Sequence, residues 1–282
     1  MSKNYLSIYA KSFSWAGFFL PKKIYQKCST LYDFCRCLDD IADQDLDLNI
    51  KKKQFSEFKN KFLMKNVDNQ IVNRMRELIH NCKISEKIVC DLFDGVESDL
   101  KKEVKINSKK ELLIYSYRVA GTVGLMMAKI LNVKGKNSLK AAVDLGIAMQ
   151  LTNIARDVIE DYARNRIYIN SNFETIKDTL KLADKFYDNS FKSISEIPAS
   201  SRFAILVARR LYRGIGYKIL NKRNMDSYKS SGKIYVSNLG KIIQTVLSIF
   251  DFIKLIFIKP GEHLKIDEHN IINEQINLNE RI

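Results

Sequence analysis

Pairs of aspartates recur at helical spacing in two separate segments of the chain. Asp39 and Asp43 lie four residues apart in the segment LYDFCRCLDDIADQ, and Asp157 and Asp161 repeat this spacing in the segment QLTNIARDVIEDYARNRIYIN. Four residues at about 100° each return to nearly the same side of an α-helix. The sequence therefore predicts two helices, each with a pair of carboxylates along one stripe.

Other polar side chains share these two stripes. Tyr32 and Arg36 fall on the same face as the first aspartate pair, and Gln150, Asn153 and Arg164 fall on the same face as the second. Apolar residues flank both stripes, whereas an ordinary amphipathic helix turns its charged residues away from its apolar side and toward water. We interpret the two stripes as walls of an internal cavity that is rich in oxygen atoms.

Clustered carboxylates need a cation, because they repel one another and lose hydration when they are brought together. Mg²⁺ suits such a cluster, since this ion takes oxygen ligands, keeps bound water and bridges to phosphate oxygens. The chain has 3 histidines without metal-ligand spacing, which argues against zinc. We predict a Mg²⁺ site, in which Mn²⁺ could substitute, with the ligands Asp39, Asp43, Asn153, Asp157 and Asp161. The alternative is that both aspartate pairs are solvated surface charges.

The segments that must position these side chains are predicted to be helices throughout. The 282 residues are 46% hydrophobic and 28% charged, a composition typical of a folded domain. The 11 glycines and 3 prolines are too few for the turns of an all-β protein. Helical periodicity runs through residues 23–44, 54–65, 70–81, 86–102, 108–131, 137–164, 178–194, 200–221 and 239–258. We expect one all-α domain over residues 1–260 and a polar, mobile tail over residues 261–282.

The charge and the cysteines limit the partners and the compartment. The formal net charge of +15 suits nucleic acid, an anionic membrane or an anionic substrate. The lysines are scattered and form no nucleic-acid-binding module, so we expect no nucleic-acid partner. The 5 cysteines are an odd set without CxxC spacing, which predicts reduced thiols in a cytoplasmic protein. A transmembrane span is not expected, because the chain lacks a run of about 20 apolar residues.

Six ordered motifs resemble the squalene and phytoene synthase family, the trans-isoprenoid head-to-head synthases. They are AKSFSWAGFFLP, LYDFCRCLDDIAD, YSYRVAGTVG, QLTNIARDVIEDYARNRIYI, LVARRLYRGIGYKIL and SGKIYVS, and they extend over most of the chain. The resemblance implies a single isoprenoid-synthase helical bundle around a central cavity. It also implies a prenyltransferase that joins two allylic diphosphates through a cyclopropylcarbinyl diphosphate and releases diphosphate at each of two steps.

The same resemblance assigns roles to individual residues. It makes Asp39 and Asp43 the first aspartate-rich motif and Asp157 and Asp161 the second. Catalytic roles beside the substrate diphosphate would also fall to Tyr32 and Arg36. Substrate-binding positions would be Ser12, Phe13, Tyr115, Gln150, Asn153, Arg156, Arg166, Tyr168, Tyr212 and Lys233. Residues expected along the hydrocarbon tunnel are Val119, Leu145, Ala148 and Met149, for which ordinary core packing is the alternative.

The opening motif AKSFSWAGFFLP resembles the phytoene and dehydrosqualene branch of the family. The chain has no glycine-rich nucleotide loop, so NADPH is not expected. We predict the condensation of two geranylgeranyl diphosphates to phytoene in carotenoid biosynthesis. The nearest alternative is a C30 squalene or dehydrosqualene synthase that uses two farnesyl diphosphates. A remote alternative is a non-catalytic basic helical scaffold, and the oligomeric state stays open.

The last predicted helix, residues 239–258, is amphipathic. Its polar face carries Lys241, Gln244, Thr245, Ser248, Asp251 and Lys254, and apolar residues fill the other face. Such a helix either buries its apolar side against the bundle or lies in a membrane interface, where flanking lysines favour anionic lipid. The sequence thus allows peripheral association with an anionic membrane, at the inner face of the cytoplasmic membrane.

Overall fold

Helices account for nearly all of the secondary structure. The computed structural model of the protein describes residues 11–64, 68–259 and 263–282, and for Lys11 and Ser12 it describes the backbone alone. The helices are α2 (Lys11–Gly17), α3 (Lys22–Asp43), α4 (Leu48–Leu63), α5 (Gln70–Cys82), α6 (Glu86–Glu97), α7 (Lys109–Ser116), α8 (Thr122–Ile130), α9 (Lys136–Ala163), α10 (Phe173–Phe191), α11 (Ala199–Leu220), α12 (Met225–Lys229), α13 (Asn238–Ile256) and α14 (Asp267–Asn273). The predicted all-α fold is confirmed.

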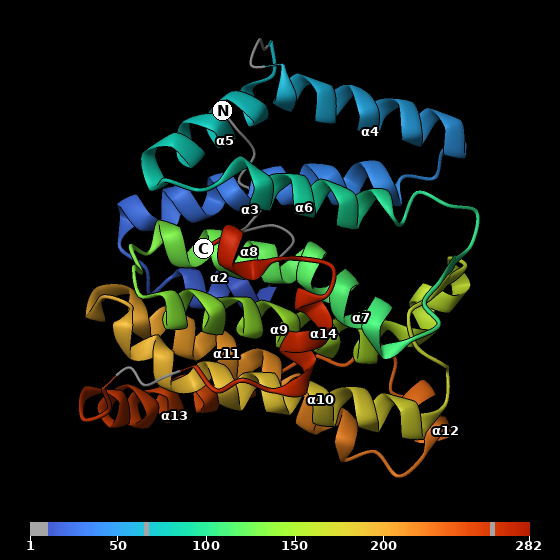
Figure 1. The fold of residues 1–282 in the computed structure, drawn as a ribbon. Helices are drawn as coiled ribbons and strands as arrows, with labels where there is room; N and C mark the ends of the chain where they lie inside the picture. The colour runs from blue at the N-terminus through green and yellow to red at the C-terminus, as the bar shows by residue number, and fades with distance from the viewer. Residues whose placement is uncertain (1–10, 65–67, 260–262) are drawn as a thin grey trace.

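The helix α9 runs through the middle of the bundle. It packs against α8, α10 and α11, while α3, α4, α5 and α6 form the upper part of the molecule in Figure 1. The lower part contains α10, α11 and α13. Both aspartate stripes therefore lie on long helices of the interior, since α3 carries the first and α9 carries the second.

Capping side chains explain where several helices begin. Asp47 caps α4 and Asn69 caps α5, because each side chain accepts hydrogen bonds from backbone N–H groups of the first turn. The helix α4 begins at Leu48, six residues before the predicted start, and the extra turns are lysine-rich. Charged residues of this kind are tolerated there because they face solvent while Phe55 and Phe58 are buried.

The segment predicted as one helix over residues 108–131 is interrupted. A π-helical turn, η1 (Tyr117–Gly121), separates α7 from α8 and shifts the faces that the two helices present. Close backbone packing against α9 accompanies it. A Cβ atom on Gly146 would lie 2.2 Å from the carbonyl oxygen of Ala120, and one on Gly124 would lie 2.2 Å from that of Ala142. Gly124 and Gly146 therefore allow the backbones of neighbouring helices to pack in direct contact.

A short parallel sheet was not predicted. Its strands are β1 (Val104–Lys105) and β2 (Arg166–Ile167), with Val104 paired with Arg166 and Lys105 paired with Ile167. Strands of two residues carry no readable periodicity, so the sequence offers no signal for them. The sheet brings the loop after α6 beside the end of α9.

The expectation of a mobile tail was wrong for the described residues 263–282. This segment forms α14 and the 3₁₀ turn η3 (Leu278–Glu280), and it inserts Ile272, Ile276 and Leu278 into the core with 0%, 3% and 5% exposure. Figure 1 shows it in red across one face of the bundle. The many polar residues of this segment hide its helix in the sequence, yet three of its apolar residues are buried in the structure.

The helix α13 turns its apolar side outward, so of the two alternatives left open by the sequence, packing of this side against the bundle is wrong. Its polar side contacts the body of the protein, where Trp15 donates a hydrogen bond from Nε1 to Thr245 Oγ1 at 3.0 Å. Arg210 binds Asp251 with two hydrogen bonds of 2.5 and 2.9 Å, and Ser248 is fully buried. Within the described residues, no helix is both long and apolar enough to cross a membrane.

All five cysteines are free thiols, as predicted. Cys28 is buried on α3, and its Sγ lies 3.4 Å from Met127 Sδ. Burial raises the pKa of the Cys28 thiol to about 12, so this thiol stays protonated and inert.

Candidate active site

The first aspartate stripe, on α3, belongs to a partly exposed cluster of charged side chains that also includes the second stripe and Asp99, and we call this cluster the recess. The side chain of Asp39 is in contact with solvent, but many protein atoms surround it and remove part of its hydration. This loss of hydration, together with the charge of Asp43, raises the pKa of Asp39 to about 7. Asp43 is held by cations from the segment after α9, since Arg166 Nη1 lies 2.7 Å and Arg164 Nη1 lies 3.3 Å from its carboxylate oxygens. These contacts join the end of α3 to the end of α9.

The second stripe, on α9, is part of the same recess. Arg156 binds Asp157 with two hydrogen bonds of 2.8 and 2.6 Å, and Lys233 Nζ lies 3.3 Å from Asp157 Oδ1. Burial and the charge of Asp157 raise the pKa of Asp161 to about 7. The structure therefore brings the two stripes together. Asp43 and Asp157 are paired with cations, and the pKa values of Asp39 and Asp161 are raised.

A fifth carboxylate, Asp99, lies between the stripes and was missed in the sequence. It accepts hydrogen bonds of 2.8 Å from the hydroxyls of Tyr115 and Tyr168, whose rings stack with centroids 4.7 Å apart. Asp99 is close enough to raise the pKa of both Asp39 and Asp161, and burial raises its own pKa.

No local signal marks Asp99. It lies outside the helices, in the loop after α6 that also contains Glu103, and the β1–β2 pairing brings this loop beside the end of α9. Tyr115 was predicted to bind substrate as a cavity residue. Its hydroxyl instead belongs to this hydrogen-bonded cluster, and Tyr115 is absent from the lining of the apolar cavity described below.

The donor atoms of the recess fit a hard divalent cation. The acids and amides offer oxygen alone, and Asn153 Oδ1 is buried without a hydrogen-bond partner among the described residues. An unpartnered buried amide oxygen is costly unless a cation or donor meets it. The raised pKa values of Asp39 and Asp161 also favour a cation at this place, because a cation between the carboxylates would relieve their repulsion.

A second cluster of ligand-type side chains does not fit a metal as well. Asp144, His263 and His269 place ligand atoms within 4.8 Å of one another, away from the recess. However, His269 Nδ1 accepts a hydrogen bond from the backbone N–H of Ile266 at 3.2 Å, so its proton lies on Nε2 and is donated to Asp144 at 2.8 Å. A protonated nitrogen cannot ligate, and we assign this cluster to fastening the tail.

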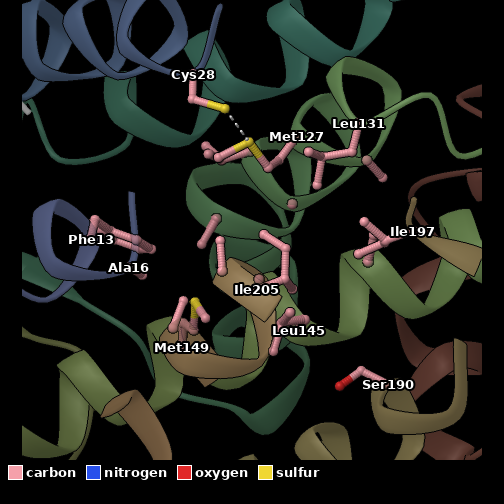
Figure 2. Close-up of a pocket in the computed structure, with 18 of the residues that line it drawn as sticks. Phe13, Ala16, Cys28, Met127, Leu131, Leu145, Met149, Ser190, Ile197 and Ile205 are labelled. Atoms are coloured by element: carbon pink, nitrogen blue, oxygen red, sulfur yellow. Dashed lines mark hydrogen bonds between the residues drawn. The ribbon is translucent and has the colours of Figure 1, made fainter. Parts of the chain in front are cut away.

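An apolar cavity of about 290 Å³ begins beside the recess (Figure 2). Tyr32, Gln150 and Asn153 line it at the polar end, and Ile194 and Ile197 line it at the other. The predicted tunnel residues Val119, Leu145 and Met149 line the cavity, whereas Ala148 does not. Ala148 is fully buried on another side of α9, which the sequence could not distinguish because the whole helix is apolar there.

The remaining predicted residues surround the junction of recess and cavity. Phe13 lines the cavity and packs on the ring of Tyr212, with centroids 4.9 Å apart, and Tyr212 is buried near Arg156 and Tyr32. Gln150 Oε1 accepts a weak hydrogen bond from Asn153 Nδ2 at 3.5 Å.

Two other predicted residues are less well placed. Arg36 pairs with Asp40 at 2.6 Å while remaining close to Asp39, and Lys233 pairs with Glu160 as well as with Asp157. The side chain of Ser12 lies outside the described residues.

The chain is similar in sequence to several known proteins. The family model of squalene/phytoene synthase matches residues 6–172. The 4,4'-diapophytoene synthase of Staphylococcus haemolyticus is 30% identical over 260 residues, which cover 83% of this chain and 90% of the relative. Phytoene synthase 1 of Solanum lycopersicum is 28% identical over 83% of this chain, and the match spans 63% of that relative's length.

A solved structure shares the architecture as well. A dehydrosqualene synthase crystallised with a ligand superposes with a TM-score of 0.70 at 26% identity, over 89% of this chain and 94% of that one. The fold resemblance therefore extends well beyond the residues that the family model matches.

Proposed function

Because the chain belongs to the squalene/phytoene synthase family and is a transferase of the prenyltransferase type, we propose that it joins two geranylgeranyl diphosphates head to head to form phytoene. The observation that carries this proposal is the junction of a carboxylate- and arginine-lined recess with an apolar cavity. A recess of this kind suits a diphosphate, and the cavity suits its hydrocarbon tail.

The proposed reaction begins with ionisation of one allylic diphosphate. The C–O bond breaks, diphosphate leaves, and the double bond of the second substrate attacks the allylic cation to give a cyclopropylcarbinyl diphosphate after loss of a proton. This intermediate ionises in turn, rearranges and loses a second proton. The sequence of steps ends in proton loss rather than hydride addition, so it requires no NADPH.

Charge stabilisation is the main task of the recess. We propose that Asp39, Asp43, Asn153, Asp157 and Asp161 hold Mg²⁺, for which Mn²⁺ can substitute. When bound, the metal would neutralise charge on the departing diphosphate. The guanidinium groups of Arg156 and Arg166 lie beside Asp157 and Asp43, where each can transfer part of its hydrogen bonding to phosphate oxygens.

The cavity would protect the carbocation. Its lining is mostly aliphatic, with Phe13 near the polar end and Tyr212 packed on Phe13, and these walls exclude the water that would quench a cation. Aromatic faces also attract a cation directly. Tyr32 lies at the same end, where its hydroxyl can reach the diphosphate.

Small side chains in the cavity wall support a C20 substrate over a C15 substrate. The wall includes Gly17, Ala120, Ala128, Ala141, Ala142, Ala204 and Ala208. Each leaves room that a larger residue would fill. A second candidate, the condensation of two farnesyl diphosphates to a C30 hydrocarbon, is favoured by the 30% identity to a 4,4'-diapophytoene synthase.

The deciding experiment is product analysis. Purified protein would be incubated with Mg²⁺ and either geranylgeranyl or farnesyl diphosphate, with and without NADPH, and the hydrocarbon identified by mass. We expect a C40 product without NADPH. A preferred C30 product would establish the second candidate, and dependence on NADPH would indicate squalene formation. Asp157→Asn should abolish turnover while the melting temperature is retained, whereas a non-catalytic scaffold would form no product at all.

We also propose a location. The enzyme would work in the cytoplasm, at the inner face of the cytoplasmic membrane, because its substrates are anionic amphiphiles and its product is a hydrocarbon.

A further inference from the structure

We infer that the outward side of α13 is a docking surface for an anionic lipid bilayer. This surface, the α13 apolar face, consists of Leu239, Ile242, Ile243, Val246, Ile249, Phe250, Ile253, Ile256 and Phe257. Its members are between 47% and 83% exposed, and they form a continuous stripe along the helix. A patch of this size on a protein surface marks an interaction site.

The polar contacts of α13 fix the helix in this orientation. The two hydrogen bonds between Arg210 and Asp251 and the bond from Trp15 to Thr245 bind one side of the helix to the body of the protein. Lys254 adds a contact with the ring of Phe191, 5.6 Å from its centroid. Because these groups would lose their partners if the helix rotated, the apolar face stays outward.

Charge complementarity identifies the partner. Residues 227–259 contain five lysines, of which Lys233 pairs with Asp157 and Glu160, and one acid, Asp251, which Arg210 already neutralises. Lys254 borders the apolar face and Lys259 follows the end of the helix, and both are exposed. An amphipathic helix that lies in the plane of a membrane has this pattern, in which apolar side chains enter the acyl boundary and lysines meet anionic headgroups.

The position of α13 connects this surface to the cavity. The helix packs against α11 and against the 3₁₀ turn η2 (Lys192–Glu196). Ile205 of α11 and Ile194 of η2 form part of the cavity wall. Phe252 of α13 contacts Phe203 of α11, with ring centroids 6.3 Å apart. Docking would therefore bring this wall close to lipid, a consequence that rests on the proposed function because it concerns a hydrocarbon product.

Vesicle flotation of the full chain tests the inference without substrate. The probes are vesicles of phosphatidylcholine alone and of phosphatidylcholine with phosphatidylglycerol. We expect co-flotation with the anionic vesicles, and weaker binding at high salt. The variant Phe250→Ser/Phe257→Ser should reduce the bound fraction by roughly tenfold or more, because two large apolar side chains no longer enter the interface.

The matched control replaces exposed apolar residues at the opposite end of the molecule. Ile50 and Met64, at either end of α4, are 47% and 74% exposed, and the variant Ile50→Ser/Met64→Ser should bind like the wild type. Equal binding of the α13 variant and the wild type, or no binding by either, would overturn the inference. So would a dimer by light scattering that the α13 variant converts to a monomer, because the face would then contact a second copy.

Failure of flotation would leave product formation intact, and failure of product formation would leave flotation intact. The two proposals are therefore tested separately.

Discussion

At the scale of single residues, Asp39 and Asp161 are unusual because folding raises their pKa to about 7. A carboxyl group with a raised pKa stabilises the fold while it is protonated. That contribution is complete below the pKa of the unfolded chain and is lost as the pH rises through about 7. In EDTA, we expect the melting temperature to fall by a few degrees between pH 5.5 and 8.

Added Mg²⁺ should reverse this loss, because a bound cation favours the ionised carboxylates. Differential scanning fluorimetry at both pH values would show a larger Mg²⁺-induced rise at pH 8. The variant Asp39→Asn/Asp161→Asn should flatten the pH dependence and remove the response to Mg²⁺. A wild-type response that is equal at both pH values would contradict the assignment of these two carboxylates.

Asp99 is the residue whose role the structure alone indicates. Its carboxylate accepts hydrogen bonds from Tyr115 and Tyr168 and lies near Arg166. Asp99→Asn keeps the shape but removes the charge, and we expect kcat/KM to fall by about 10- to 100-fold, the effect of one charge-assisted hydrogen bond. Steady-state kinetics would measure this, with Asp94→Asn as control because Asp94 is exposed on α6. Equal kinetics of the two variants would remove Asp99 from the site.

At the scale of secondary-structure elements, backbone contact between η1–α8 and α9 fixes the floor of the cavity. A Cβ at Gly146 would lie 2.2 Å from the carbonyl oxygen of Ala120, so Gly146→Ala must displace a helix and should cost about 2–4 kcal/mol. Gly214 on α11 provides the control. Its nearest neighbour for a Cβ is Val236 Cγ2 at 3.6 Å, and Gly214→Ala should stabilise by roughly 0.5–1 kcal/mol. Urea denaturation would give both values, and similar effects would refute the packing argument.

The C-terminal segment is fastened to α9 by a buried carboxylate. Asp144 accepts hydrogen bonds from His263 at 2.7 Å and from His269 at 2.8 Å, with Asn189 as a third donor at 2.6 Å. These histidine bonds hold the pKa of Asp144 below its ordinary value despite burial. Its contribution to stability is therefore present at neutral pH and is lost as the pH falls through that lowered pKa.

Asp144→Asn should destabilise the protein by about 1–3 kcal/mol at pH 7, because it leaves buried donors without their charged acceptor. Urea denaturation would measure this loss. His80 offers the comparison, since it is exposed on α5, and His80→Asn should change the stability little. A stable Asp144→Asn protein would show that apolar contacts such as Ile272 suffice to hold the tail.

At the scale of the whole molecule, the depth of the cavity should set the chain length of the substrate. Ala141 lies in the wall with 2% exposure, and Ala141→Leu would place additional carbon atoms in the empty space. We expect the ratio of kcat/KM for the C20 substrate over the C15 substrate to fall by roughly tenfold or more. Competition between the two substrates, read by product mass, would measure this ratio, and an unchanged ratio would place the end of the tail elsewhere.

Regular helices and their aspartate stripes were predictable because both are local. The period of 3.6 residues fixes which side chains share a face, so Asp39 with Asp43 and Asp157 with Asp161 follow from spacing alone. The wall residues Val119, Leu145 and Met149 were also identified, although their neighbour Ala148 was assigned to the cavity in error. Residues 145–149 of α9 are all apolar or glycine, so periodicity cannot say which of them meet a void.

By itself, the sequence determined the helical class, the acid pairs and the motifs of the family, since each depends on residues close together in the chain. Tertiary structure alone decided that Asp99 joins the recess, that the residues after 263 pack into the core, and that α13 faces outward. These features arise from contacts between distant segments, such as Trp15 with Thr245, 230 residues apart, and Asp91 with Arg281, 190 residues apart. The free energy of such contacts depends on the three-dimensional arrangement and leaves no periodic trace in the chain.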